Sequence, residues 1–418
     1  MSIKPALTFL LFGVALCACA GAKTREPDPK TVDEIRNLQA QAKKEDDALR
    51  PIAVVHLVER AVGLMEGLVG ADNGRMVDAW LMLAEAYREM DDFDKSLVAM
   101  EKAQDILTQP GFERSPMRGK AMVEHARILS AMGKQNEAID KAQEGVEILK
   151  VSTGPASPAV IKALYHQAII FKDAGQHARA VENLSASLRI IQKDEGAESF
   201  EFTRTLHSLA EVHADTKQFE RAESLHRQAL AIRQRTLGNN ALTARSLQRL
   251  AEFQHERGEN AQALELLRKA VTMLEPAGPS KECASILADL GTVERALDID
   301  GEPSLARSVK MYEDAYGKGA APIADVLVER AKNAQKQGRN QQADQFLGQA
   351  INVTEQAFGP KSPRVAGVMI EKARIQTERG DLANARVSVD QAAQLVRGVS
   401  LSPKREKELR EIQGQLAR

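Results

Sequence analysis

The chain has 418 residues, of which 43% are hydrophobic, 28% are charged and only 4% are aromatic. Alanine and leucine therefore supply most of the apolar content, which suits close helix–helix contacts, and we predict an all-α fold. The formal net charge of −1 excludes the strongly basic balance expected of a general nucleic-acid binder.

The first predicted element is an export signal at residues 1–18. Lys4 provides its short positive region, and the 11 residues from Ala6 to Leu16 form an apolar core. A membrane-spanning helix needs about 20 apolar residues, so this core is too short to cross a bilayer. We therefore expect the segment to be cleaved.

The end of this signal resembles the lipobox of bacterial lipoproteins. The residues Leu16-Cys17-Ala18-Cys19 match its order, and the resemblance implies that Cys19 carries the lipid and begins the mature chain. Cys17 is the weaker candidate. Ala20-Gly21, with no Asp after the cysteine, resembles lipoprotein cargo sorted to the outer membrane. The alternative is an ordinary secretory signal, cut after Ala18, Ala20 or Ala22.

Residues 19–30 are predicted to form the lipidated cysteine and a flexible tether. The stretch 20–30 has no apolar period and contains two prolines, and its extended length is roughly 36 Å at about 3.3 Å per residue. With Cys19 acylated, Cys283 would be the only thiol of the mature chain, so no intramolecular disulfide could form. We expect Cys283 to lie inside a helix.

A small residue recurs through the remaining chain at a nearly constant spacing. In residues 203–238, two runs of apolar residues at helical spacing are separated by a polar break at 215–218, so two short helices should pack antiparallel. Ala210 of this pair has counterparts in steps of 40 to 42 residues at Ala84, Ala126, Ala168, Ala251, Gly291, Ala331 and Ala373. Such a period is typical of stacked helix pairs.

One unit resembles the tetratricopeptide repeat family, through Trp80, Leu83, Ala84, Tyr87, Ser96, Met100 and Ala103. Seven residues after the small residue, most units have a glycine that fits a helix end with positive φ: Gly133, Gly175, Gly258, Gly338 and Gly380. The period near 42 is similar to the repeat variety of kinesin light chains. The resemblance covers roughly residues 70–400 and implies a right-handed α-solenoid of about eight to nine helix pairs.

We assign the repeat array to residues 31–400, with an irregular first unit at 31–69. A polar capping helix is predicted at 401–418, beginning at Ser402-Pro403. One unit departs from the pattern, because the residue twelve positions after Gly291 is Pro303. Five extra residues would bring Ser308 back into phase, so a bulging loop is expected in the sequence LDIDGEPS.

No sequence motif of a known catalytic site is present: HExxH, CxxC, GxSxG, GxGxxG and GxxxxGK[ST] are all missing from the sequence. Two ExxH pairs, Glu223–His226 and Glu252–His255, lack the two further carboxylates that such pairs accompany in metal sites, and His226 has the spacing of a core residue. We predict a non-enzymatic protein without cofactor or metal, with a metal-binding enzyme as the less favoured alternative.

In the tetratricopeptide family, the first helix of each unit lines a concave groove. Six positions before the small residue, four successive units have a cation: Lys120, Lys162, Arg204 and Arg245. We name these four residues the basic ladder. Further groove candidates on the same predicted helices are His166 and Arg249, two positions before the small residue, and the nearby Tyr165 and His207. This set suits an acidic or carboxylate-ended peptide.

Two alternatives accompany the basic ladder. Its cations could be solvated surface charges that pair with Glu211 and Glu252. A comparison with the carboxylate clamp of chaperone-binding tetratricopeptide proteins fits only in part: Arg245 and Arg249 have the spacing of its cationic pair, whereas Tyr165, Ile169 and Ser208 replace its remaining residues. The sequence therefore does not predict that clamp.

These observations predict a membrane-anchored, non-enzymatic scaffold that binds a protein or peptide in its groove. The resemblances favour a role in assembling a bacterial cell-envelope or secretion complex, on the periplasmic face of the outer membrane. The alternative is a soluble exported or regulatory adaptor.

Overall fold

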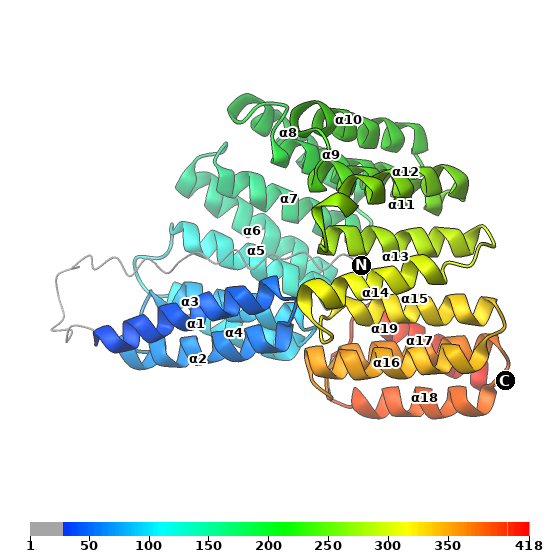
Figure 1. Ribbon diagram of the computed structural model, residues 1–418. Helices are drawn as coiled ribbons and strands as arrows, with labels where there is room; N and C mark the ends of the chain where they lie inside the picture. The colour runs from blue at the N-terminus through cyan, green and yellow to red at the C-terminus, as the bar shows by residue number, and fades with distance from the viewer. Residues whose placement is uncertain (1–27, 399, 418) are drawn as a thin grey trace.

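The computed structural model describes residues 28–398 and 400–417, which form nineteen α-helices and one short 3₁₀ helix (Figure 1). The predicted export signal and Cys19 lie outside these residues. Within the described ranges, no helix combines the length and apolar character needed to cross a membrane.

The helices pack as nine consecutive antiparallel pairs and a final single helix, which confirms the predicted all-α solenoid. The first five pairs are α1 (Pro29–Asp47) with α2 (Pro51–Val69), α3 (Met76–Glu89) with α4 (Phe93–Leu107), α5 (Pro116–Ala131) with α6 (Gln135–Thr153), α7 (Pro158–Asp173) with α8 (His177–Asp194), and α9 (Phe200–Asp215) with α10 (Phe219–Leu237). The others are α11 (Ala241–Glu256) with α12 (Asn260–Leu274), α13 (Lys281–Ala296) with α14 (Glu302–Tyr316), α15 (Pro322–Lys336) with α16 (Asn340–Phe358), and α17 (Pro363–Glu378) with α18 (Leu382–Leu395). The 3₁₀ helix η1 (Glu275–Ala277) follows α12, and α19 (Pro403–Leu416) ends the array.

Local sequence sets where these helices begin and end. Ser115 and Ser157 each cap a helix N-terminus and accept a hydrogen bond from a backbone N–H of its first turn, and a proline follows each serine. The connections within pairs contain a residue in the left-handed region, such as Gly133 at φ 81° and Gly175 at φ 73°. This confirms the conformation predicted from the glycine spacing.

The recurring small residues allow the helices of each pair to approach closely. Ala126, Ala168 and Ala210 occupy equivalent places in α5, α7 and α9, and each has an exposed fraction of 0%. In the second pair, the Ser96 hydroxyl donates a hydrogen bond to the Ala84 carbonyl oxygen at 2.6 Å. Cys283 is buried inside α13, as expected.

In the departing unit, the connection between the two helices is shorter than predicted, so the prediction of five extra residues is wrong. The connection between α13 and α14 is residues 297–301, only two longer than residues 257–259 of the preceding pair. Leu305 then occupies the place that Ala263 has in α12. The larger side chain fits because Gly291 faces it: an added Cβ on Gly291 would lie 2.5 Å from Leu305 Cγ.

The two ends of the solenoid meet, so the array closes into a ring. In Figure 1, the blue and cyan helices lie beside the yellow, orange and red ones. The Ala321 amide donates to the Leu49 carbonyl oxygen at 3.1 Å, and the Ser400 hydroxyl donates to Asp94 Oδ1 at 3.1 Å. Apolar contact accompanies these bonds, because Phe358 of α16 packs in the same cluster as residues of α2 and α3.

Candidate functional site

A cavity of about 460 Å³ lies inside the ring. Its lining comes mainly from the odd-numbered helices α11, α13, α15, α17 and α19, together with Leu49 of the connection between α1 and α2. In this part of the array, the first helix of each pair therefore faces the interior, as the repeat resemblance implied. We refer to the interior surface as the channel.

The basic ladder occupies one position on four successive odd helices. Lys120 and Lys162 are exposed on α5 and α7, while Arg204 and Arg245 are partly buried on α9 and α11. Arg245 borders the cavity. The guanidinium carbon of Arg204 lies 4.3 Å from the centre of the Tyr165 ring, a favourable cation–π arrangement, and its charge also pairs with Glu201.

The arginines of α11 are held close to each other. Partial burial lowers the pKa of Arg245, and the charge of Arg249 lowers it further. Arg249, which is not a residue of the basic ladder, also forms an ion pair with Glu211. Holding like charges together costs free energy, and the charges of Glu282 and Glu252 offset part of that cost.

Tyr165 and His207 require a correction, because the structure places both in the interior and not on the channel surface. Their exposed fractions are 4% and 2%. The Tyr165 hydroxyl shares a hydrogen bond of 3.0 Å with Ser208 Oγ. His166 is only partly buried and meets the Tyr165 ring edge-on, with 5.6 Å between ring centres. Tyr165 and His207 both lie three positions before the small residue and pack toward the neighbouring pair, so these two side chains cannot contact a partner directly.

His207 belongs to a buried chain of polar side chains between α9, α10 and α11. Arg233 Nη1 donates to Ser246 Oγ at 2.9 Å, and His207 lies between Ser246 Oγ at 3.0 Å and His226 Nδ1 at 2.9 Å. Arg233 can only donate, and these distances are consistent with Ser246 donating to His207 Nε2 and His207 Nδ1–H donating to His226. We name these four residues the buried relay. Burial lowers the pKa of His226 to about 4.

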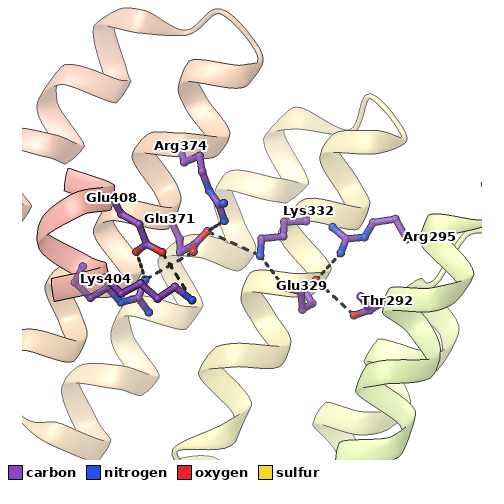
Figure 2. Close-up of polar contacts among 9 residues, drawn as sticks. Thr292, Arg295, Glu329, Lys332, Glu371, Arg374, Lys404 and Glu408 are labelled. Carbon is purple, nitrogen blue, oxygen red and sulfur yellow. Dashed lines mark hydrogen bonds and ion pairs between the residues drawn. The ribbon is translucent and has the colours of Figure 1, made fainter. Parts of the chain in front are cut away.

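The other half of the channel contains a network of alternating charges, shown in Figure 2. Glu329 on α15 accepts hydrogen bonds from Arg295 at 2.6 Å and from Lys332 at 2.8 Å. Lys332 also approaches Glu371 on α17 at 3.9 Å, and Arg405 on α19 lies 3.7 Å from the same carboxylate. The network therefore connects α13, α15, α17 and α19 across the wall of the channel.

Carboxylates occupy one repeat position on the helices of this half of the channel. Two positions before the small residue, the last three pairs have Asp289, Glu329 and Glu371. Desolvation by the surrounding protein raises the pKa of Asp289 to about 6, and desolvation and the charge of Asp289 raise that of Glu252 to about 7. We did not predict this row of carboxylates, although the position two before the small residue, followed through the last three units, contains it.

The two ExxH pairs do not form a metal site in the structure. His226 is buried against His207, and Glu223 accepts hydrogen bonds from Arg227. His255 Nδ1 is hydrogen-bonded to Asn260 Oδ1 at 2.5 Å. Within residues 28–398 and 400–417, no group of three or more His, Cys, Asp or Glu side chains is arranged to hold a metal ion.

Comparison with known proteins agrees with this architecture. Residues 77–106, 201–275 and 324–364 match models of the tetratricopeptide repeat. The chain therefore contains tetratricopeptide repeats, and its fold is a tetratricopeptide-repeat solenoid. None of the curated proteins searched matches the chain.

Several solved structures share the fold. BtubC (BKLC) from P. vanneervenii is 18% identical, with 60% of this chain and 93% of that chain covered and a TM-score of 0.43. A Rap protein complexed with competence and sporulation factor is 12% identical, covering 81% and 89%, with a TM-score of 0.49. The apo quorum sensor NprR from B. thuringiensis is 11% identical, covering 88% and 99%, with a TM-score of 0.49. At these identities the likeness concerns the fold alone.

Proposed function

We propose that this protein is a membrane-anchored, non-enzymatic scaffold that binds an acidic segment of a partner protein along the basic half of its channel. The proposed setting is the assembly of a cell-envelope or secretion complex in a bacterium. The observation that carries the proposal is the basic ladder, four cations at one repeat position on neighbouring helices.

The electrostatics of the ladder support an anionic occupant. Lys120 and Lys162 are exposed, so both are available to a ligand. Arg245 borders the cavity in a setting where burial and Arg249 disfavour its charge. A carboxylate-bearing segment would restore that balance, and guanidinium groups bind carboxylates in a geometrically specific way.

The partner-binding step can be tested with a photo-reactive amino acid placed in the channel. Replacing Glu124, on α5 two positions before Ala126, should give a cross-link to a partner in cells, which mass spectrometry would identify. Reversing three ladder charges, with Lys162, Arg204 and Arg245 changed to Glu, should remove that cross-link. Arg249 is left unchanged because Glu211 already neutralises it.

A matched control reverses three exposed cations on the even helices, changing Arg189, Lys193 and Lys269 to Glu. Both triple variants change the net charge by the same amount. A difference in cross-linking between them must therefore come from the position of the ladder cations. Circular dichroism should show that both remain helical. A cross-link that survives the ladder reversal would refute the role of these cations.

Membrane anchoring is tested separately, through Cys19. The Cys19→Ala variant should move from the membrane fraction to the soluble fraction, because acyl chains contribute about 0.8 kcal/mol for each methylene buried in lipid. Cys283→Ala is the control for loss of a thiol. An unchanged distribution of Cys19→Ala would favour the soluble adaptor.

A further inference from the structure

The ring closes along one line of contact, which we name the seam. On one side are the connections that end α1, α3 and α5, at Leu49, Asp91 and Gly133. On the other side are the beginnings of α15, α17 and α19, represented by Ala321, Arg364 and Pro403. Three successive repeats on one side thus meet three helix N-termini on the other, in order.

The helix ends that meet at the seam are electrostatically complementary. The Ala321 amide, at the N-terminus of α15, donates to the Leu49 carbonyl oxygen at 3.1 Å. Arg364, at the start of α17, donates to the Glu89 carbonyl oxygen at 2.9 Å and lies 3.2 Å from Asp91 Oδ2. Because helix C-termini carry partial negative charge and N-termini partial positive charge, both contacts are attractive.

The third contact of the seam depends on the absence of a side chain. An added Cβ on Gly133 would overlap Pro403 Cγ and would lie 3.4 Å from Pro403 Cβ. The proline ring of α19 therefore rests directly on the backbone of the connection after α5.

Leu49 is the unusual residue of the seam. It has φ 57°, a conformation that is unfavourable for a bulky side chain. The other eight pairs have at this turn position a glycine, an aspartate or a lysine: Asp91, Gly133, Gly175, Lys217, Gly258, Asp298, Gly338 and Gly380. The exposed fraction of Leu49 is only 8%, because its side chain packs among residues of α13, α14 and α15. The unfavourable backbone conformation of Leu49 thus accompanies an apolar contact between its side chain and helices far away in the sequence.

The seam is a weaker interface than those within the array. Neighbouring pairs are joined covalently and bury long helix faces against each other, whereas the seam joins mainly helix ends. Its ion pair is also partly exposed, with 25% of the Arg364 side chain and 39% of the Asp91 side chain accessible, and partly exposed ion pairs contribute little to stability. If the ring opens, it opens here.

We propose that the seam is a reversible latch that controls the entry of a partner segment into the channel. The proposal rests on the proposed function, since it concerns access to the same site. Leu49 connects the seam with the proposed binding site, because it closes the seam and also borders the cavity. A closed ring admits a chain end by threading, whereas an internal segment of a folded partner can enter only when the seam is open.

The test uses a latch variant and a control at the same turn position. Leu49→Gly removes the apolar contact while relieving the unfavourable backbone, so loss of folding is not expected. Lys217→Gly makes the same backbone change in an exposed turn away from the seam. The radius of gyration from small-angle X-ray scattering should increase for Leu49→Gly and stay unchanged for Lys217→Gly. Equal radii for both variants and the unmodified protein would overturn the latch.

A second arm locks the seam. A Gly133→Cys, Pro403→Cys double variant removes the proline ring that an added Cβ would overlap, and it leaves the two Cβ atoms 3.4 Å apart, close to the separation in a disulfide. The probe is a fluorescein-labelled 16-residue peptide of alternating Glu and Ala, cyclised head to tail so that it cannot thread. Its association rate should rise severalfold in Leu49→Gly and fall at least tenfold in the oxidised double variant, with recovery on reduction.

These readouts separate the latch from the proposed function. A probe that binds the oxidised and reduced double variants at the same rate, with the disulfide confirmed by thiol titration, would refute the latch while leaving partner binding intact. A probe that binds no variant would refute the acidic ligand, and the scattering comparison would still decide whether the seam opens. If the disulfide does not form, the Leu49→Gly comparison decides alone.

Discussion

The buried relay gives a prediction that can be followed from atoms to a measurable change in stability. His226 occupies the place in α10 that Leu184 has in α8 and Leu267 has in α12. We therefore consider His226→Leu, which restores the apolar residue of the other pairs. It also removes the ring that is hydrogen-bonded to His207 Nδ1, and a buried polar group left without a partner costs about 1–3 kcal/mol.

The pH dependence follows from the lowered pKa of His226. Its ordinary value of 6.5 applies in the unfolded chain, and burial lowers it to about 4 in the folded protein. Between these values the unfolded chain binds more protons, so stability is fully present above pH 6.5 and is lost as the pH falls toward 4. At about 1.4 kcal/mol per tenfold change in proton affinity, the loss is about 3 kcal/mol. Burial also lowers the pKa of His207, which adds to the loss in the same direction.

Several buried carboxylates oppose this effect, so variants must be compared at each pH. The pKa values of Glu85 and Glu252 are raised to about 7, and those of Asp46 and Asp289 to about 6. The folded protein therefore binds their protons first and gains stability on acidification. These groups are present in both proteins, so their contribution largely cancels when His226→Leu is subtracted from the unmodified protein. The difference in unfolding free energy between the two proteins therefore reports on the buried relay.

The assay is urea unfolding followed by circular dichroism at pH 7.5, 6, 5 and 4.5. His226→Leu should be the less stable protein at pH 7.5, and the gap should shrink by about 2–3 kcal/mol at pH 4.5. His255→Leu, in a partly exposed position at the end of α11, is the control for loss of a histidine outside the buried relay. Parallel pH profiles for the unmodified protein and His226→Leu would refute the reasoning.

Three further predictions concern the packing of single pairs. Gly291→Ala should destabilise the array even though alanine favours a helix by about 1 kcal/mol, because the added methyl would overlap Leu305 at 2.5 Å and overpacking costs about 1–3 kcal/mol. Adding Leu305→Ala should recover part of that loss, and a purely additive double mutant in urea unfolding would contradict the contact. Leu184→Ala should cost about 2–5 kcal/mol, since the side chain is fully buried, and hydrogen exchange should locate the loss in α7 to α9. Ser199→Ala should cost about 1 kcal/mol by removing the cap that accepts the Phe202 amide at 3.2 Å, measurable as faster exchange in the first turn of α9 and contradicted by unchanged exchange.

The repeat period predicts most of the fold. A small residue every 40 to 42 positions placed Ala126, Ala168 and Ala210 in equivalent, fully buried positions, because each pair repeats the same local packing. The period predicts less reliably on which face of its helix a residue lies. His207 lies on a helix of the basic ladder, yet it turns toward the neighbouring pair and is hydrogen-bonded to His226, a contact that depends on side-chain geometry across two helices.

The insertion and the seam show two other limits of the sequence. The phase of Ser308 indicated five extra residues, whereas Leu305 enters the small-residue position because Gly291 makes room for it. The seam joins turns to helix starts 270 to 275 residues away, and such distances leave no local pattern. Leu49 was the only available signal, as a bulky residue at a turn position that otherwise has glycine, aspartate or lysine.

Closure of the ring also restricts how the protein can change in length. In an open solenoid, each unit turns the next by a small angle, and a unit can be gained or lost at modest cost because no other contact depends on the total. In this ring the accumulated rotation must bring Leu49 back to Ala321. Duplicating or deleting one pair would leave that register unsatisfied, so the copy number of repeats is itself a structural constraint, and length variation should be confined to loops on the outer rim.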